Sequence, residues 1–362
     1  MKRLLTILLL TLLVAGAAGP LHAQQPSTTA EEIRAGQEAA RQIETQFKVL
    51  TDEAIVTRLT RVGRAVAAAA DRDLPYTFKA LDIKEPNAVS LPGGFVYVTK
   101  GMLAFVRSDH ELAAVLAHEV AHAAHGHQIE MMRRATRINL WTFILILLTR
   151  DSNVAVGAQA VGESVLSGYT RDLERDADLT SIDYLVKTTY TPVAALTLME
   201  RLLWEERLRP EVDLGAFRDH PKTKERVEYI LADLRRRGIP LVRRPAANYL
   251  RIALRTATEQ GKPIGELLVN ETVVVRLPDM DRLSTVASRL DRFFNTDPLA
   301  FDVTAAQAEG GWGVFGRWTL LVAFTAADAQ FVGGPPQTAA IDLAARLRWL
   351  IDQDIRTRKF TG

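Results

Sequence analysis

The sequence contains no cysteine among its 362 residues. It therefore has no disulfide framework, no thiolate nucleophile and no thiolate metal ligand. Any metal ion that the chain binds must be held by histidine, aspartate or glutamate. The formal charge is nearly balanced, at +2, so the composition indicates neither a nucleic acid nor an acidic partner.

Apolar runs long enough to cross a membrane are absent as well. Residues 1–23, MKRLLTILLLTLLVAGAAGPLHA, have a positive start, a short apolar centre and the small residue Ala23 at their end. This pattern is typical of a secretory signal peptide, and its apolar centre is shorter than the roughly 20 residues that span a bilayer. We expect cleavage near Ala23 and an exported, periplasmic protein. An uncleaved N-terminal anchor is the alternative.

A second apolar run, INLWTFILILL, occupies residues 138–148. It is also too short to cross a bilayer. A buried core helix would explain it, and so would a segment that contacts a membrane surface or covers a cleft. The basic residues Arg133, Arg134 and Arg137 before it suit anionic headgroups and a solvated helix face equally well. Membrane association therefore stays open.

The remaining pattern predicts an α+β fold in two domains. Apolar residues recur at helical spacing over most of residues 24–240, and only short stretches such as 76–83 and 95–101 indicate strands. This predicts a mainly helical domain with a small edge sheet. After GIPLVRRPAANYL the pattern changes to strands mixed with helices, which predicts a small α+β domain at residues 245–362. This second domain shows no functional motif and no repeat.

Four of the seven histidines lie in the stretch LAHEVAHAAHGHQ, at His118, His122, His125 and His127. The first two enclose Glu119 in an HExxH motif. On a helix, residues four apart share one face, so His118 and His122 can bind the same zinc ion. Glu119, beside the first ligand, can take a proton from an attacking water.

A third ligand must come from elsewhere, because catalytic zinc usually has three protein ligands. A metzincin would have glycine at position 125 and histidine at position 128, where this chain has His125 and Gln128. A carboxylate from a second helix remains. In YTRDLERDADLTSIDYL, Glu174 could bind the metal while Asp178, four residues later, accepts a hydrogen bond from a ligating imidazole. A solvated, charged helix face would give the same spacing.

These segments together resemble metallopeptidase family forty-eight, a family of gluzincin zinc endopeptidases. The resemblance covers residues 31–237 and rests on EIRAGQEAARQIETQFKVLTDEAIVTRLTRVGRAVA, NAVSLPGGFVYVTKGML, SDHELAAVLAHEVAHAAHGH, TRDLERDAD and DHPKTKERV. It implies a gluzincin-type core with one zinc ion per chain on His118, His122 and Glu174. It also implies that Glu119 is the catalytic base and that Asp178 supports a ligating imidazole.

The resemblance further implies a substrate-binding edge. In the family, the segment that corresponds to Asn87, Pro92, Gly93 and Gly94 lies beside the cleft. A strand edge at this place can pair with the extended backbone of a polypeptide substrate.

His220 and Arg226 match a second family-like pattern, HPxxxxR, and their roles stay open. His220 could simply hold its loop at the entry to a helix. Alternatively, His220 or Arg226 could stabilise the oxyanion that forms during peptide hydrolysis. A third hypothesis is that His220 occupies the open zinc position and keeps the enzyme latent until a substrate moves the loop.

The other histidines are expected to stay off the metal. His110 is two helical turns before His118 and too far away to share its ligand. We expect His125 to lie near the site without binding. His127 is expected on the opposite side of the helix from His122, in a packing or capping role.

These observations predict a zinc endopeptidase of the cell envelope, and the resemblance implies that its substrates are misfolded or misassembled envelope proteins. The alternative is a chaperone-like envelope assembly factor whose protease core is largely latent. Polypeptide substrates are the expected partners, with envelope assembly machinery or a membrane surface as further candidates.

Overall fold

The computed structural model describes residues 29–134, 171–208, 223–259 and 262–358. The signal-peptide prediction, the apolar run at 138–148 and His220 lie outside these residues.

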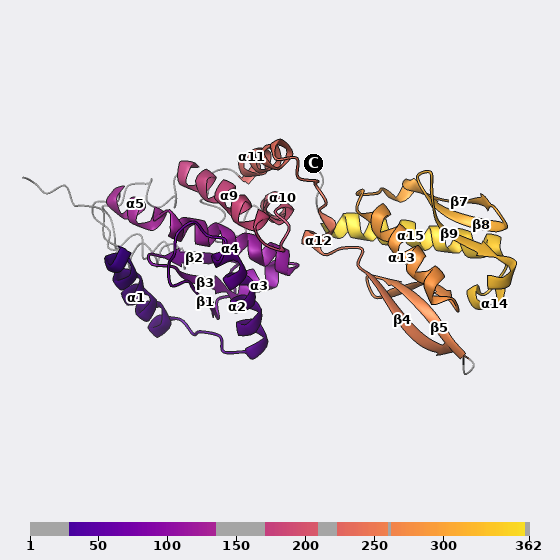
Figure 1. Cartoon of the computed structure of the whole chain (residues 1–362), viewed down its shortest axis with the longest axis horizontal. Helices are drawn as coiled ribbons and strands as arrows, with labels where there is room; N and C mark the ends of the chain where they lie inside the picture. Colours follow the sequence, from indigo (N-terminus) through magenta and orange to yellow (C-terminus); the bar gives the residue numbers. More distant parts are fainter. Residues whose placement is uncertain (1–28, 135–170, 209–222, 260–261, 359–362) are drawn as a thin grey trace, which may run out of the picture.

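Figure 1 shows the described chain as two parts placed end to end, with α12 between them. The helices are α1 (Thr29–Gln46), α2 (Glu53–Ala67), α3 (Lys100–Phe105), α4 (Asp109–Ala124), α5 (His127–Arg134), α9 (Arg171–Val186), α10 (Val193–Leu208), α11 (Thr223–Arg236), α12 (Arg244–Ala247), α13 (Met280–Phe294), α14 (Ala329–Val332) and α15 (Pro336–Arg358). The strands are β1 (Thr77–Leu81), β2 (Ala88–Leu91), β3 (Phe95–Thr99), β4 (Ile252–Glu259), β5 (Lys262–Val269), β6 (Thr272–Leu277), β7 (Val303–Ala308), β8 (Gly311–Gly316) and β9 (Thr319–Thr325).

These elements confirm the predicted α+β class. The first part of the chain is mainly helical and has one small sheet, in the order β1-β3-β2. Strand β1 pairs in parallel with β3, and β2 pairs with β3 in the antiparallel sense. Strand β2 is therefore an edge strand, and helix α4 packs against both β2 and β3.

Helix α4 runs through the centre of this first part. Its start is fixed by Ser108, whose side chain accepts a hydrogen bond from the backbone N–H of Glu111. From Glu111 to Ala124 every residue of the helix is buried. Because α2, α9 and α10 all contact α4, this helix has almost no solvent-facing side. Its polar residues are therefore enclosed by neighbouring elements.

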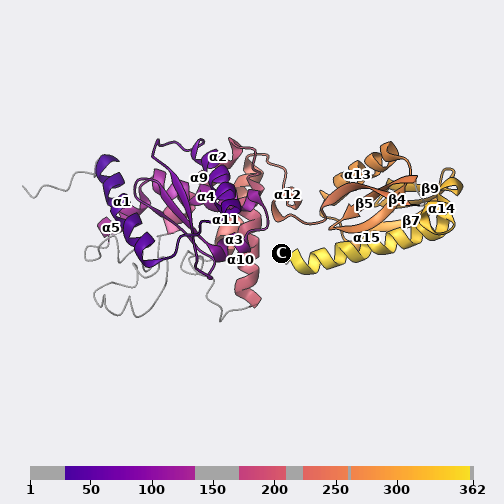
Figure 2. The ribbon, with the colours of Figure 1, turned by 90° about the horizontal axis from the view of Figure 1, so that it is seen from below.

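The second part has its own hydrophobic core, made of buried residues from Ala247 to Ile351. Its strands form two antiparallel sheets, β4-β5-β6 and β7-β8-β9. Helix α13 contacts the first sheet, whereas the long helix α15 runs along the second sheet, as Figure 2 shows. Most residues of β4 from Ala253 to Thr258 are exposed. An exposed strand does not need an apolar face, and the sequence of β4 accordingly shows no regular apolar pattern.

Among the described residues, two hydrogen bonds join α12 and the residue after it, which lie between the two parts, to the start of α4. The hydroxyl of Ser108 donates a hydrogen bond to the carbonyl of Ala246, at 2.5 Å. The side chain of Asn248 donates another to the carbonyl of Arg107, at 2.9 Å. Among the described residues, no helix is both long enough and apolar enough to pass through a membrane.

Candidate metal centre

Helix α4 presents two histidines on one side. His118 and His122 are four residues apart, so their side chains leave the helix in nearly the same direction. Both are buried: His118 is 7% exposed and His122 is fully enclosed. Burying two imidazoles in an apolar helix is costly unless they have specific partners. The neighbouring helix supplies such partners.

Helix α9 brings Glu174 to these histidines. Helices α4 and α9 contact each other, and both contain short, fully buried side chains: Ala117 and Ala121 on α4, and Ala177 on α9. Short side chains let two helices approach closely, so a carboxylate on one helix can reach imidazoles on the other. Glu174 lies in the first turn of α9 and is fully buried.

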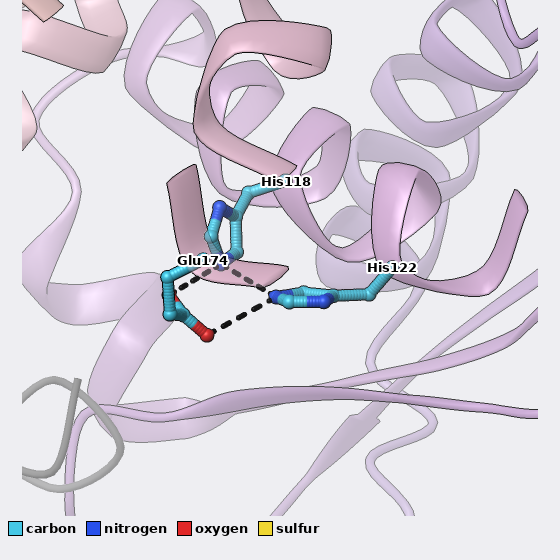
Figure 3. Close-up of side chains that lie close together, drawn as sticks. All are labelled: His118, His122 and Glu174. Carbon is cyan, nitrogen blue, oxygen red and sulfur yellow. Dashed lines mark hydrogen bonds and ion pairs between the residues drawn. The ribbon is translucent and has the colours of Figure 1, made fainter. Parts of the chain in front are cut away.

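Three ligand atoms converge between the two helices, as Figure 3 shows. Nε2 of His118 lies 3.0 Å from Nε2 of His122. The Glu174 carboxylate lies 3.5 Å from Nε2 of His118 and 3.4 Å from Nε2 of His122. A tetrahedral zinc ion with ligands at about 2.0–2.1 Å would separate its ligand atoms by about 3.3 Å. The spacing and the donor types therefore fit zinc.

Asp178 supports His118 from behind. Its Oδ1 lies 3.0 Å from Nδ1 of His118, the ring nitrogen that faces away from His122. Arg226 of α11 donates two hydrogen bonds to the same carboxylate, from Nε at 2.8 Å and from Nη2 at 2.7 Å. The hydroxyl of Tyr229 also donates to Asp178. This arrangement fixes the orientation of the His118 ring.

Charge keeps Asp178 ionised in spite of its burial. Burial alone would raise the pKa of Asp178, but the Arg226 charge and the hydrogen bond from His118 outweigh it and hold this pKa below its usual range. Burial alone would likewise lower the pKa of His118, whereas Asp178 and Glu174 together keep it above its usual value. In the buried site, the negative charge of Asp178 is thus offset by the positive charge of Arg226.

The position of Arg226 bears on its predicted role at an oxyanion. The guanidinium is 1% exposed and contacts Asp178, with Nη1 3.5 Å from Glu174. It lies behind the ligands rather than at an open side. This placement favours a role in holding the two carboxylates over the predicted contact with a reacting oxygen.

The predicted base, Glu119, points toward the edge strand β2. Its Oε2 accepts a hydrogen bond from Oγ of Ser90, at 3.0 Å. Gln128 in turn donates to Oγ of Ser90 at 2.7 Å and to the Ser90 carbonyl at 3.1 Å. Sequence reasoning missed Ser90 and Gln128. The available signal was a serine between the buried Val89 and Leu91, since a buried polar side chain needs a partner.

The segment predicted to form a substrate-binding edge beside the cleft is largely buried. Pro92, Gly93 and Gly94 are buried. Helix α1 covers the turn, because a Cβ added to Gly36 would lie 1.8 Å from the Pro92 carbonyl oxygen. Asn87 is 1% exposed and pairs through its backbone with Thr99. The part of this segment that reaches the site is therefore Ser90, not the Pro-Gly-Gly turn.

The expected position of His127, on the opposite side of the helix from His122, is wrong. Helix α4 ends at Ala124, and a turn at Gly126, which has a φ of +65°, separates it from α5. His127 is consequently not carried to the far side of α4. Its Nδ1 lies 2.8 Å from Nδ1 of His122, and its side chain is buried. Burial is the largest cause that lowers the pKa of His127, to about 3.

His125 lies outside the main ligand group, as expected. It sits between Asp176 and Asp71, with Nε2 3.1 Å from the Asp71 carboxylate. His125, His127 and Asp176 form a second group of side chains whose ligand atoms lie within 4.8 Å of one another. His110 is not part of either group and accepts a hydrogen bond from the backbone N–H of Thr191, at 3.1 Å.

Known proteins with similar sequences share this region. Residues 54–233 match the model of peptidase family M48. The mitochondrial metalloendopeptidase OMA1 of Schizosaccharomyces pombe is 29% identical over 167 residues, which cover 46% of this chain and 49% of that protein. The beta-barrel assembly-enhancing protease of Escherichia coli K12 is 27% identical over 221 residues, or 58% of this chain and 44% of that protein.

A shorter relative is covered more fully. The metalloprotease LoiP of Escherichia coli K12 is 27% identical over 180 residues, which cover 48% of this chain and 68% of that protein. By contrast, the chain spans less than half the length of the OMA1 protein and of the assembly-enhancing protease. The shared region contains all the residues that converge at the candidate metal centre.

Proposed function

Because the chain belongs to peptidase family M48 over residues 54–233, we propose that it is a zinc-dependent endopeptidase of the cell envelope. The convergence of His118, His122 and Glu174 beside Glu119 carries this proposal. Two imidazoles and one carboxylate form a donor set that suits zinc and leaves a position open for chemistry. One zinc ion per chain would be held in this way.

The chain's own residues then account for peptide hydrolysis. A bound zinc ion supplies Lewis acidity, which polarises a peptide carbonyl. The Glu119 carboxylate removes a proton from the attacking water and passes it to the departing amine. Ser90 holds Glu119 through its 3.0 Å hydrogen bond, so the carboxylate keeps its direction during both transfers. Asp178 fixes the ring of His118.

The proposed location and substrates rest on the sequence and on the relatives. Residues 1–23 have the signal-peptide pattern, which supports export. The names of two relatives refer to β-barrel assembly and to a metalloprotease. We propose misfolded or misassembled envelope proteins as the substrates, because an extended backbone is what a peptidase cleft accepts.

A Glu119→Gln variant tests the reaction. Glutamine keeps the shape and the hydrogen bond from Ser90 but cannot take a proton. We expect cleavage of an unfolded protein substrate to be abolished, while the zinc content of the purified protein stays at one ion per chain. Glu53→Gln, a surface change on α2, serves as the matched control and should leave cleavage unaltered. Cleavage by the Glu119→Gln protein would contradict the role of Glu119 as the base.

We further propose that His220 keeps the enzyme latent. His220 belongs to the family-like pattern HPxxxxR, whose Arg226 lies beside the metal ligands. A histidine near the site could occupy the open zinc position and exclude water. His220→Ala should then raise basal proteolysis several-fold in an assay with unfolded protein. Unchanged or lower activity would count against latency and favour a role at the oxyanion.

The second candidate function is a chaperone-like assembly factor. One observation favours it: the second part of the chain exposes large aromatic side chains, with Trp318 97% and Phe301 75% exposed. Exposed aromatic residues are typical of surfaces that bind other proteins. If binding dominates, Glu119→Gln should still prevent aggregation of an unfolded protein, and a Trp318→Ser, Phe301→Ser variant should not. The opposite pattern would favour the peptidase alone.

A further inference from the structure

His122 and His127 make a direct contact between two imidazole rings. Nδ1 of His122 lies 2.8 Å from Nδ1 of His127. The rings meet edge to face, with centroids 5.0 Å apart. Both side chains are buried, so the contact is shielded from water and the two nitrogens must share one hydrogen.

The position of the shared hydrogen follows from the geometry of His122. Its Nε2 faces His118 and Glu174 and is the nitrogen available to a metal ion. A neutral imidazole that binds metal through Nε2 carries its hydrogen on Nδ1. Nδ1–H of His122 therefore donates to Nδ1 of His127. His127 must then carry its own hydrogen on Nε2, which lies 3.3 Å from Oδ2 of Asp176.

We propose that His127 is a positioning residue for the metal ligand His122, through a relay of hydrogen bonds that ends on Asp176. This inference rests on the proposed function, since it assigns a partner to a proposed zinc ligand. It gives the two histidine ligands different supports. His118 contacts a carboxylate directly, whereas His122 contacts one through a second imidazole.

Asp176 is itself held in place. His125 contacts it through Nδ1 and reaches Asp71 through Nε2, at 3.1 Å. The other oxygen of Asp71 accepts a hydrogen bond from the Tyr184 hydroxyl, at 2.5 Å. The relay thus connects the end of α4, helix α9 and the segment after α2. Each link restrains the next one, so the direction of the His122 ring depends on several elements.

The same side chains raise a rival interpretation, in which His125, His127 and Asp176 bind a second metal ion. Metal binding at Nε2 of His127 would move the hydrogen of this ring to Nδ1. That hydrogen would then face the Nδ1–H of His122 across 2.8 Å. Two N–H groups cannot share this contact, so the hydrogen-bonded relay and a second metal on His127 exclude each other. The relay leaves every nitrogen of the two rings with a partner.

The turn at Gly126 places His127 next to His122, and this glycine can be recognised in the sequence. Its φ of +65° is a conformation that other residues adopt only with strain. This turn ends α4 and returns His127 toward His122. An uninterrupted helix would have placed His127 about half a turn away. In the segment His125-Gly126-His127, the glycine thus allows His127 to contact His122, the second proposed ligand.

Zinc affinity of the full chain, measured by competition with a chelator, tests the proposal. His127→Phe keeps a ring but removes the acceptor, and we expect about 10- to 100-fold weaker zinc binding. His127→Asn places a carbonyl oxygen near the position of Nδ1, so it should restore most of the affinity. His110→Phe, the same change elsewhere on α4, should leave zinc affinity unchanged. The melting temperature of each zinc-free protein provides the second readout.

Asp176→Ala provides an independent variant at an exposed position, where misfolding is less of a concern. It should weaken zinc binding less than His127→Phe, because the contact to His122 remains. The inference is overturned if His127→Phe binds zinc as tightly as the unaltered chain. It is also overturned if the unaltered chain binds a second zinc ion that His127→Phe or Asp176→Ala removes. Absence of any zinc binding by the unaltered chain would instead overturn the proposed function together with the inference.

Discussion

Arg226 and Asp178 form a two-point contact in which both side chains are almost completely buried, at 1% and 3% exposure. The contact joins α11 to α9, and Asp178 continues it to His118 on α4. This ion pair therefore connects α11 and α9 to His118 of α4, a residue of the candidate metal centre. Such a pair adds little net stability by itself, but losing one partner leaves a buried charge without compensation.

The first prediction concerns this pair. Arg226→Met should lower the free energy of unfolding by about 3–5 kcal/mol, because Asp178 would remain as an uncompensated buried charge. Zinc affinity should fall as well, since the His118 ring loses its fixed support. Urea unfolding and chelator competition measure the two effects.

Two further variants control this prediction. Arg236→Met removes an arginine from the same helix, but its side chain is 71% exposed, so the change should cost less than about 1 kcal/mol. Adding Asp178→Asn to Arg226→Met should recover part of the lost stability, because the buried charge disappears. Equal losses at positions 226 and 236 would argue against the described role of Arg226.

The second prediction concerns Ser90 and the base. A hydrogen bond to a charged group contributes about 1.5–3 kcal/mol, so Ser90→Ala should lower kcat by about tenfold or more with little change in KM. Steady-state kinetics on a peptide substrate would measure this. Ser288→Ala, an exposed serine on α13, is the control. A change confined to KM would show that Ser90 acts on substrate binding rather than on Glu119.

The convergence of the residues at the candidate metal centre could be anticipated because their signals are local or come from the resemblance. His118 and His122 follow from a spacing of four residues on one helix. Glu174 stood out only beside the family-like segments, since its spacing from Asp178 also suits a solvated helix face. The structure brings all four residues together.

Other features depend on contacts between distant segments, which a sequence pattern does not encode. The contact between Ser90 and Glu119 arises only after β2 packs against α4. The position of His127 differs from the expected one for another reason: α4 ends at Ala124, so its helical periodicity does not continue past Gly126 to residue 127. A glycine after a helical run is a known termination signal, and it was present in the sequence.

The third prediction concerns the packing of α1 over the Pro92 turn. A Cβ at Gly36 would lie 1.8 Å from the Pro92 carbonyl oxygen, so Gly36→Ala forces α1 away from the turn. We expect a loss of about 1–3 kcal/mol in the free energy of unfolding, as for other overpacked sites. Gly334→Ala, where the nearest atom is 3.9 Å away, should change stability by less than about 0.5 kcal/mol. Equal effects of the two changes in urea unfolding would contradict this packing.

The fourth prediction is a pH dependence at the start of α4. Asp109 contacts Arg58 and Arg61 of α2, at 2.7 Å and 2.5 Å. Burial would raise the pKa of Asp109, but hydrogen bonds from Arg61 and Arg58 outweigh it and lower this pKa. Because the folded pKa lies below the unfolded one, the stabilisation is present above about pH 4 and is lost as the pH falls through the folded pKa.

Asp109→Asn removes this ionisable group and tests the sign. The variant should be less stable than the unaltered chain near neutral pH, by about 1 kcal/mol or less, because the pair is partly exposed and screened by solvent. The difference should shrink as the pH falls below about 4 and should vanish once the pH is below the lowered folded pKa, where Asp109 is protonated in the folded unaltered chain too. Replacing Arg58 and Arg61 with glutamine should produce the same pH profile. A difference that is constant from neutral to acidic pH would mean that Asp109 stabilises α4 without its charge.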